Sequence, residues 1–193
     1  AERPEAPAGA VFEADAKELL RRVLEIEGLC KSVHRGGEKE VGGLKIQRLV
    51  EEASYSVWSA HAADSPVAFA CSEVYLATDL PVEAVLWAIY GTEERLRWDK
   101  KSFLDFRVIR PGAPQAESRA LGDAIYCRMP TPSGMSDRDV VQERFLLRLP
   151  EGGHAIVMRS PSAEGAAALG VAPVGGAVRM QTHLSGYRLR PLP

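Results

Sequence analysis

The residues best placed to do chemistry together are an arginine and an aspartate in the segment Arg95-Leu-Arg-Trp-Asp99. They are four positions apart, so in a helix they share one face and can form an ion pair. One reading is a solvated pair that contributes little to stability. The other is a pair inside an apolar cavity, where a cation and an anion at fixed separation suit a zwitterion or a polar head group. The spacing alone leaves both readings open.

A second charged cluster is Ser136-Asp137-Arg138-Asp139, at a predicted loop-to-strand junction. Arg138 has an aspartate on either side and can pair with either. We therefore expect a salt-bridged turn that fixes the entry of the chain into the strand.

The remaining reactive residue types form no recognisable constellation. The four histidines are far apart in the sequence, and the spacings of Cys30, Cys71 and Cys127 fit neither a zinc site nor a CxxC motif. The sequence also lacks the nucleophile-elbow, P-loop, dinucleotide-binding and HExxH patterns. It therefore predicts buried reduced thiols, no catalytic residue, no metal and no cofactor.

Charge and composition exclude further classes. The 193 residues include 24 Lys and Arg against 26 Asp and Glu, a formal net charge of −2, whereas dedicated nucleic-acid binders usually carry a basic excess. No apolar run approaches the length of a membrane span. We expect a cytoplasmic or peripheral membrane protein. The chain begins Ala-Glu-Arg-Pro without Met, so an earlier targeting segment remains open.

The first third of the chain predicts an arm, a helix and strands. Residues 1–11 contain two prolines and no apolar period, which predicts a disordered arm before one domain over 12–193. Apolar residues at helical spacing predict a helix over about 14–27, with Asp15 as a cap and Gly28 as the stop. Three strands are expected within 44–77. Alternation leaves open whether Val67, Phe69 and Cys71 or the opposite set, which begins at Ala68, faces a cavity.

The rest of the chain predicts two helices and then strands. The helices are expected from Pro81 to Tyr90 and from Thr92, as a cap, to Trp98. A constrained loop covers 130–137, where Gly134 and the apolar Met135 suit either a gate or a rigid turn, and 162–176 is expected to be mobile. Strands that follow one another without helical crossovers predict an antiparallel sheet and an α+β fold. The expected strands are 103–110, 117–128, 139–149, 154–160 and 176–190.

Several motifs, in this order, resemble the START family, the StAR-related lipid-transfer domains. The resemblance covers about residues 14–193, and four motifs fall in register over about 100 residues. They are Arg95-x-x-Trp98-Asp99 after Trp87, Met129-Pro130 with Met135-Ser-Asp-Arg138-Asp139, Val157-Met-Arg-Ser160, and Gly176-Ala-Val-Arg179 with Ser185-Gly-Tyr187 and Pro191.

The resemblance implies a helix-grip fold, in which a curved antiparallel sheet wraps around a C-terminal helix and encloses a hydrophobic cavity for one lipid. By analogy with phosphatidylcholine-transfer members, Arg95 and Asp99 are the buried pair that contacts the phosphate or choline of the head group. The positions of the aromatic choline cage fall here on Ile125, Val140 and His183. Ile and Val cannot hold a quaternary ammonium by cation–π attraction, so the resemblance does not extend to choline selectivity.

The last predicted strand contains a conflict. The resemblance puts His183 in the cavity, whereas alternation puts Met180 and Leu184 inside. The two agree only if a bulge intervenes. Family members also continue with a final strand and a long helix after the segment that ends here at Pro193, so these elements are expected to be missing from the chain. The chain is then incomplete, which we favour, or a partner supplies the elements, or the fold is remodelled.

The resemblance implies a non-enzymatic protein that binds one phospholipid, sterol or ceramide and transfers it between membranes. Its partners are a lipid ligand and, transiently, a membrane surface, without nucleic acid; the oligomeric state is not predicted. The alternative is a lipid-sensing regulatory module of a larger protein. An enzyme of the wider helix-grip superfamily is a third reading that no nucleophile–base motif supports.

Overall fold

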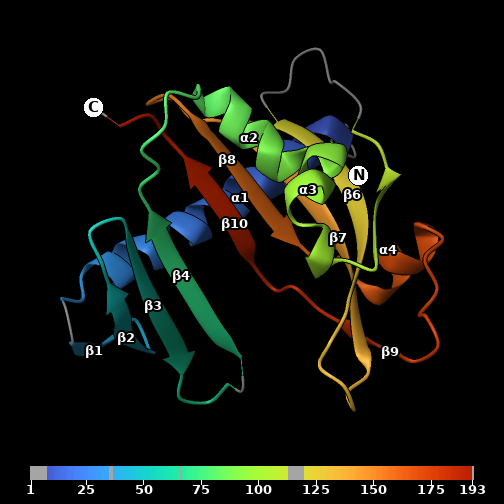
Figure 1. The fold of residues 1–193 in the computed structure, drawn as a ribbon, viewed down its shortest axis with the longest axis horizontal. Helices are drawn as coiled ribbons and strands as arrows, with labels where there is room; N and C mark the ends of the chain where they lie inside the picture. The colour runs from blue at the N-terminus through green and yellow to red at the C-terminus, as the bar shows by residue number, and fades with distance from the viewer. Residues whose placement is uncertain (1–7, 35–36, 66, 113–119, 193) are drawn as a thin grey trace, which may run out of the picture. The chain divides into compact units, whose positions relative to one another are not determined.

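The computed structural model describes residues 8–34, 37–65, 67–112 and 120–192 (Figure 1). The chain forms two compact units, one of Ala1–Leu20 with Leu80–Pro193 and one of Arg21–Asp79. Each unit is described by itself below. Residues 1–7 of the predicted arm and 117–119 of a predicted strand lie outside the described residues.

Helix α1 (Ala8–Lys31) confirms the first predicted helix but is longer at both ends. It includes residues 8–11, which the sequence assigned to the arm. Gly28 does not end the helix, because Cys30 beyond it is buried in a core and Lys31 forms an ion pair with Glu27, one turn back. Asp15 lies inside the helix rather than at its cap, and its Oδ2 accepts a hydrogen bond from Arg159 at 2.6 Å.

The unit Arg21–Asp79 contains a four-stranded antiparallel sheet in the order β1-β2-β3-β4. Its strands are β1 (Glu38–Val41), β2 (Leu44–Glu51), β3 (Tyr55–Ala62) and β4 (Ala68–Val74). Three of the four were predicted. Strand β1 was missed because Glu-Lys-Glu-Val carries almost no apolar alternation.

The core of this unit lies between the sheet and the last turns of α1. Phe69 and Cys71 of β4 pack against it, so that face of β4 points to the helix. Which of the two alternating sets faces a ligand cavity stays a prediction. The fully buried members are Cys30, Val33, Ile46, Trp58 and Ala60.

The other unit begins with the two predicted helices, α2 (Val82–Tyr90) and α3 (Thr92–Trp98), followed by the 3-10 turn η1 (Lys100–Ser102). Gly91 lies between the helices and takes the N-cap position expected for Thr92. A side chain at Gly91 would lie 2.8 Å from the carbonyl oxygen of Trp87. Only glycine therefore allows the chain to turn this tightly from α2 into α3.

A six-stranded sheet completes this unit, and it confirms the α+β class. Strands β10-β8-β7-β6-β5 run antiparallel in that order, and β9 pairs in parallel with β7. The strands are β5 (Asp105–Arg110), β6 (Ala120–Met129), β7 (Asp137–Arg148), β8 (His154–Arg159), β9 (Ala177–Met180) and β10 (Ser185–Leu189).

Two predictions about the C-terminal third are wrong. Residues 176–190 are not one strand, because the chain leaves the sheet at 181–184 between β9 and β10. The segment expected to be mobile contains helix α4 (Ala163–Ala168), whose N-terminus is capped by Ser162 through a hydrogen bond from Gly165 N to Ser162 Oγ.

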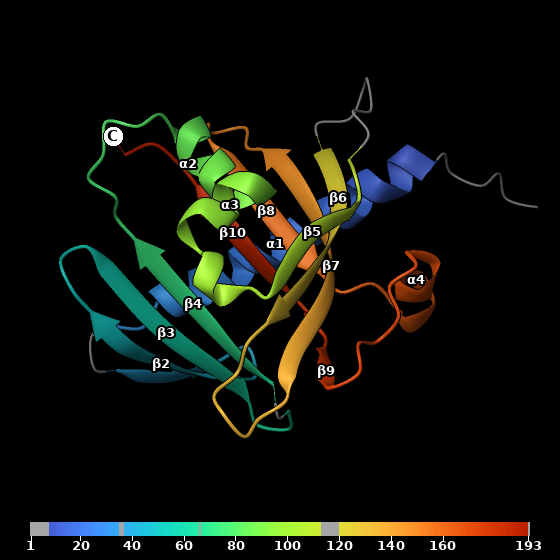
Figure 2. The same ribbon diagram turned by 45° about the vertical axis from the view of Figure 1, so that its right-hand side comes forward.

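Strands β6 and β7 are covered on both faces. On one face Ile125, Cys127 and Val140 form a buried cluster, and on the other Tyr126 and Val141 pack with Val171. Figures 1 and 2 both place α3 on one side of β7 and α4 on the other. The two faces of the sheet therefore carry two separate cores.

Candidate functional site

The Arg95–Asp99 ion pair predicted from the sequence is present at the end of α3. Arg95 Nη2 lies 2.6 Å from Asp99 Oδ2, and the two side chains are only 19% and 18% exposed. Asp99 follows the last residue of α3, and its backbone N–H donates to the carbonyl of Arg95. The prediction that the two residues lie within hydrogen-bond distance is confirmed, and both side chains are partly buried.

Aromatic rings surround the guanidinium of Arg95. Its Cζ lies 4.3 Å from the ring centroid of Trp98 and 5.8 Å from that of Phe103, so both rings contribute cation–π attraction. Within the described residues, the buried Nε of Arg95 has no hydrogen-bond partner. Arg95 thus keeps one N–H donor available, which is the feature a bound acceptor would use.

Asp99 is held in its charged form. Ser102 Oγ donates to Asp99 Oδ1, and together with the hydrogen bond from Arg95 this lowers the pKa of Asp99 below its ordinary value, against the effect of burial. At neutral pH the site therefore presents a cation and an anion with nearly balanced charge.

Ile125 and Val140 lie in one buried cluster with Cys127. Phe103 packs against this cluster and also faces Arg95, so it connects the ion pair to both predicted residues. Phe103 and Phe106 stack on each other with centroids 4.7 Å apart. Sequence reasoning missed these two phenylalanines, because nothing in their spacing marks them as facing Arg95.

His183 is exposed and lies in the segment between β9 and β10 that belongs to no strand. Met180, the last residue of β9, packs against the cluster of Ile125 and Val140. An irregular segment follows Met180, so the strand alternation that reaches Met180 does not extend to His183. The role of His183 in ligand binding stays a prediction.

The pairing expected for Arg138 is wrong. Its guanidinium donates to the backbone oxygen of Ser136, and other arginines take the two aspartates. Arg128 donates to Asp137 at 2.7 Å, and Arg179 donates to both oxygens of the buried Asp139 at 2.9 Å. These arginines come from β6 and β9, so local sequence could not identify them.

A buried ion pair that the sequence did not reveal lies between β6 and β7. Arg144 donates from Nε to Asp123 Oδ1 at 2.8 Å and from Nη2 to Asp123 Oδ2 at 2.5 Å. Its third donor, Nη1, reaches the backbone oxygen of Tyr90 at 2.8 Å. This arginine therefore ties the C-terminal end of α2, and with it the start of α3, to the sheet.

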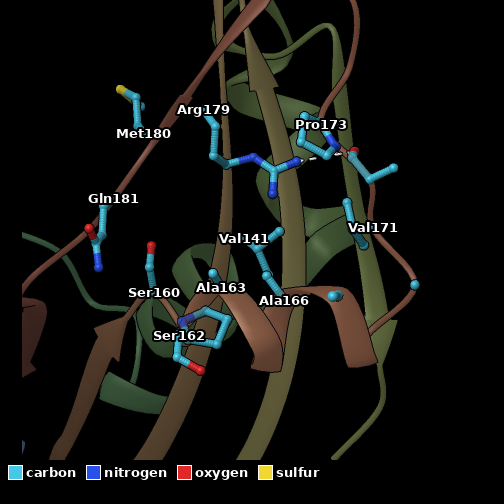
Figure 3. A pocket seen from close by; sticks show the side chains of 14 residues that line it. Val141, Ser160, Ser162, Ala163, Ala166, Val171, Pro173, Arg179, Met180 and Gln181 are labelled. Carbon is cyan, nitrogen blue, oxygen red and sulfur yellow. Dashed lines mark hydrogen bonds between the residues drawn. The ribbon is translucent and has the colours of Figure 1, made fainter.

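A pocket of about 720 Å³ lies on the α4 side of the sheet (Figure 3). Val141 and Val171 line it, together with alanines of α4 and Arg179, whose guanidinium points toward Pro173 and donates to the oxygen of Ala172. Its lining includes none of the five residues predicted for ligand binding. The expected cavity with the ion pair in its wall thus stays a prediction.

Residues 130–136 form a compact turn between β6 and β7. Thr131 Oγ1 donates to the backbone oxygens of Met135 and Ser136, and Gly134 has a φ of +89°, a conformation that favours glycine. The side chain of Met135 is 56% exposed at the tip. The turn is internally held and still presents an apolar side chain to the outside.

The described residues also bear on metal binding and on membrane spanning. His, Cys, Asp and Glu side chains in this part of the chain nowhere gather in the threes that a metal ion needs. None of the helices in the same ranges has the length and apolar character to cross a bilayer.

Comparison with known proteins gives no match to a family model and none to a curated protein. Solved structures do match. Human StAR-related lipid transfer protein 5 superposes with a TM-score of 0.69 at 17% identity, over 95% of this chain and 76% of that one. Human STARD10 superposes with a TM-score of 0.59 at 19% identity, over 78% of this chain and 55% of that one.

A bacterial structure agrees with the human ones. The STAR-related lipid transfer protein of Xanthomonas axonopodis superposes with a TM-score of 0.53 at 13% identity, over 78% of this chain and 82% of that one. The fold described above is thus shared with these solved structures. The chain has the helix-grip fold of the START domains.

Proposed function

We propose that this protein binds one lipid in an internal cavity and transfers it between membranes without chemical conversion. The observation that carries the proposal is the Arg95–Asp99 pair, which is largely buried beside aromatic rings in a START fold. Two of the matching structures are named as lipid transfer proteins, and this supports the same class of ligand here.

The chemistry of the pair favours a polar head group over a purely apolar ligand. The Nε–H of Arg95 can donate to a phosphate or hydroxyl oxygen while Nη2 remains on Asp99. Such a hydrogen bond is stronger at a site from which water is excluded. Because Asp99 balances the charge of Arg95, a zwitterionic or neutral head group fits better than one with several negative charges.

The lipid class is left to experiment among phospholipids, sterols and ceramides. Ile125 and Val140 offer a choline group no aromatic face, and Phe103 and Phe106 face each other. Cation–π recognition of choline needs open ring faces around the cation. The proposed ligand is therefore a lipid of one of these three classes, without selectivity for phosphatidylcholine.

Arg95→Gln is expected to lower lipid transfer about tenfold, the equivalent of about 1.4 kcal/mol. The variant removes the charged donor while keeping a side chain of similar length. The measurements are transfer of fluorescent phospholipid, sterol and ceramide between vesicles, and native mass spectrometry of lipid that purifies with the protein.

Arg107→Gln is the matched control, because this arginine of β5 has a side chain that is 60% exposed. It should transfer lipid as the unmodified protein does. Transfer that is unchanged in Arg95→Gln would remove the assigned role of the pair. Absence of transfer and of bound lipid for all three classes in the unmodified protein would contradict the proposed function itself.

The surface beside the ion pair suits contact with an anionic membrane. Trp98 and Leu104 are both 57% exposed, and the basic residues Arg97, Lys100 and Lys101 are exposed between or next to them. Indole rings favour the membrane–water interface, and basic residues are attracted to anionic lipid head groups. We propose that α3 and η1 contact the membrane while lipid is exchanged.

Lys100→Gln is expected to weaken binding to vesicles that contain phosphatidylserine by roughly fivefold at physiological salt. Raising the ionic strength should reduce the difference, because salt screens exposed charges. Co-sedimentation with vesicles measures the effect. Lys39→Gln, an exposed lysine of β1, makes the same change in net charge and should bind normally. Equal weakening by both variants would show attraction by net charge instead of by this surface.

A further inference from the structure

The pocket on the α4 side of the sheet lies where β7 changes its partner strand. Strand β9 pairs with β7 as far as Val140, and β8 pairs with β7 from Glu143 onward. Val141 and Gln142 lie between these positions and pair with neither β9 nor β8, and Val141 lines the pocket. The opening is therefore a consequence of the strand pairing itself.

Hydrogen bonds hold one wall of this pocket in place. The backbone N–H of Ser160, just after β8, donates to the oxygen of Thr182 at 2.7 Å, and the N–H of Thr182 donates to Ser160 Oγ at 2.9 Å. Gln142 Nε2 also donates to Thr182 Oγ1, at 2.8 Å. The chain after β8, the chain after β9 and the middle of β7 are thus tied together beside the pocket.

Small and apolar side chains form much of the lining. Ala163, Ala166 and Ala167 of α4 have no atom beyond Cβ, so they leave the space between α4 and the sheet unfilled. Val141 and the buried Val171 add larger apolar surfaces. The volume of about 720 Å³ lies within the range of sites that bind small molecules.

Two hydrogen-bond donors in the lining are available to a ligand. Arg179 uses Nε and Nη2 for Asp139 and the oxygen of Ala172, while its Nη1 makes no hydrogen bond within the described residues. The side chain of Arg179 is 26% exposed and that of Asp139 1%, so the pocket meets the guanidinium rather than the carboxylate. The hydroxyl of Ser160, which accepts from Thr182, keeps its own hydrogen.

We propose that this pocket is a second ligand site, for a small amphipathic molecule that carries one carboxylate. The carboxylate accepts a hydrogen bond from Nη1 of Arg179, and the apolar body packs on Val141, Val171 and the alanines of α4. In Figure 3 the guanidinium lies above Val141 and Ala166, which places the charge at one end of the pocket and the apolar surface below it.

Charge selects this class of ligand. The guanidinium of Arg179 attracts a hydrogen-bond acceptor and repels a cation, and bonds to a charged acceptor are stronger than those to a neutral one. Asp139, buried behind Arg179, balances most of its charge, so one negative charge fits better than several. A carboxylic acid with an apolar chain or ring has both properties.

The site is separate from the ion pair of Arg95 and Asp99. Val140 packs in the cluster with Ile125 on one face of β7, and Val141 packs on the other face. The proposal therefore does not depend on the lipid function, and either can fail without the other.

The test titrates the whole protein with octanoate, an eight-carbon carboxylate, and measures binding by calorimetry and by NMR shifts of assigned amides. We expect saturable binding with shifts at lining residues such as Gly170 and Gln181. Octyltrimethylammonium has the same chain with the opposite charge and should bind about tenfold more weakly or less, because Arg179 repels it. Octanol should fall between the two.

Ala166→Leu fills the pocket from α4 and is expected to weaken octanoate binding about tenfold or more, since its side chain occupies the space of the ligand. Ala168→Leu is the matched control, because Ala168 is an exposed residue of the same helix and lies outside the lining. It should bind octanoate as the unmodified protein does. Thermal unfolding shows whether both variants are folded.

Four results would overturn the proposal. They are no saturable binding of octanoate, equal binding of octanoate and octyltrimethylammonium, unchanged binding in folded Ala166→Leu, and loss of binding in Arg95→Gln, which would place the carboxylate at the lipid site. If Ala166→Leu does not fold, the NMR shifts of the unmodified protein still decide, because shifts that leave Gly170 and Gln181 unaffected contradict the assigned pocket.

Discussion

Asp123→Ala is expected to lower the free energy of unfolding by about 3–5 kcal/mol, because it leaves a buried arginine without its counter-charge. The side chains of Arg144 and Asp123 are only 4% and 7% exposed. Arg144 would keep its bond to the oxygen of Tyr90 and its position 4.3 Å from the Tyr90 ring centroid, and neither replaces a carboxylate. Urea unfolding measures the change.

The matched control is Asp105→Ala on the neighbouring strand β5. Asp105 lies 3.7 Å from Arg107, and both side chains are well exposed. Exposed pairs contribute about 0–1 kcal/mol, so this variant should unfold almost as the unmodified protein does. Equal losses in the two variants would show that Asp123 does not depend on its buried partner.

Asp139→Asn is expected to cost about 1.5–3 kcal/mol at neutral pH, the range for hydrogen bonds to a charged group. Asp139 is fully buried, and the two bonds from Arg179 hold the pKa of its carboxyl below the ordinary value of 3.8. A carboxyl with a lowered folded-state pKa contributes stability that is present above its unfolded pKa. That stability is lost as the pH falls through the folded-state pKa.

The pH dependence is therefore the sharper measurement for Asp139. The difference in stability between the unmodified protein and Asp139→Asn should be constant from neutral pH down to about pH 5 and should shrink in more acid solution. Asp137→Asn is a useful comparison, since this side chain is 24% exposed and pairs with Arg128. A stability difference for Asp139→Asn that stayed constant below the ordinary pKa would contradict the assigned ion pair.

Most of the fold could be predicted from the sequence, in the segments where apolar residues recur at a clear helical or strand spacing. Of the ten strands in the described part of the chain, alternation and turn residues predicted nine in outline, with β9 and β10 merged into one, and apolar spacing predicted α1, α2 and α3. It failed at β1, which has little alternation, and at α4, whose Ala-Glu-Gly-Ala-Ala-Ala has no apolar face to detect. A run of small residues is compatible with both a loop and a helix.

The candidate site was predictable only where its residues are close in sequence. Arg95 and Asp99 are four apart, and their pairing was found. The two buried pairs of the sheet were missed, although Asp123 lies directly opposite Arg144, and Asp139 directly opposite Arg179, in the strand pairing. Pattern reading finds strands but not their register, and only the register brings these charges together.

The bond from Arg144 to the carbonyl of Tyr90 has a wider consequence. The next carbonyl along the chain, that of Gly91, accepts the backbone N–H of Arg95, so the buried pair Arg144–Asp123 and Arg95 are linked through two consecutive residues of the backbone. Under the proposed function, a lipid bound at Arg95 should therefore raise the melting temperature, and screening lipids by this effect is a direct way to identify the ligand.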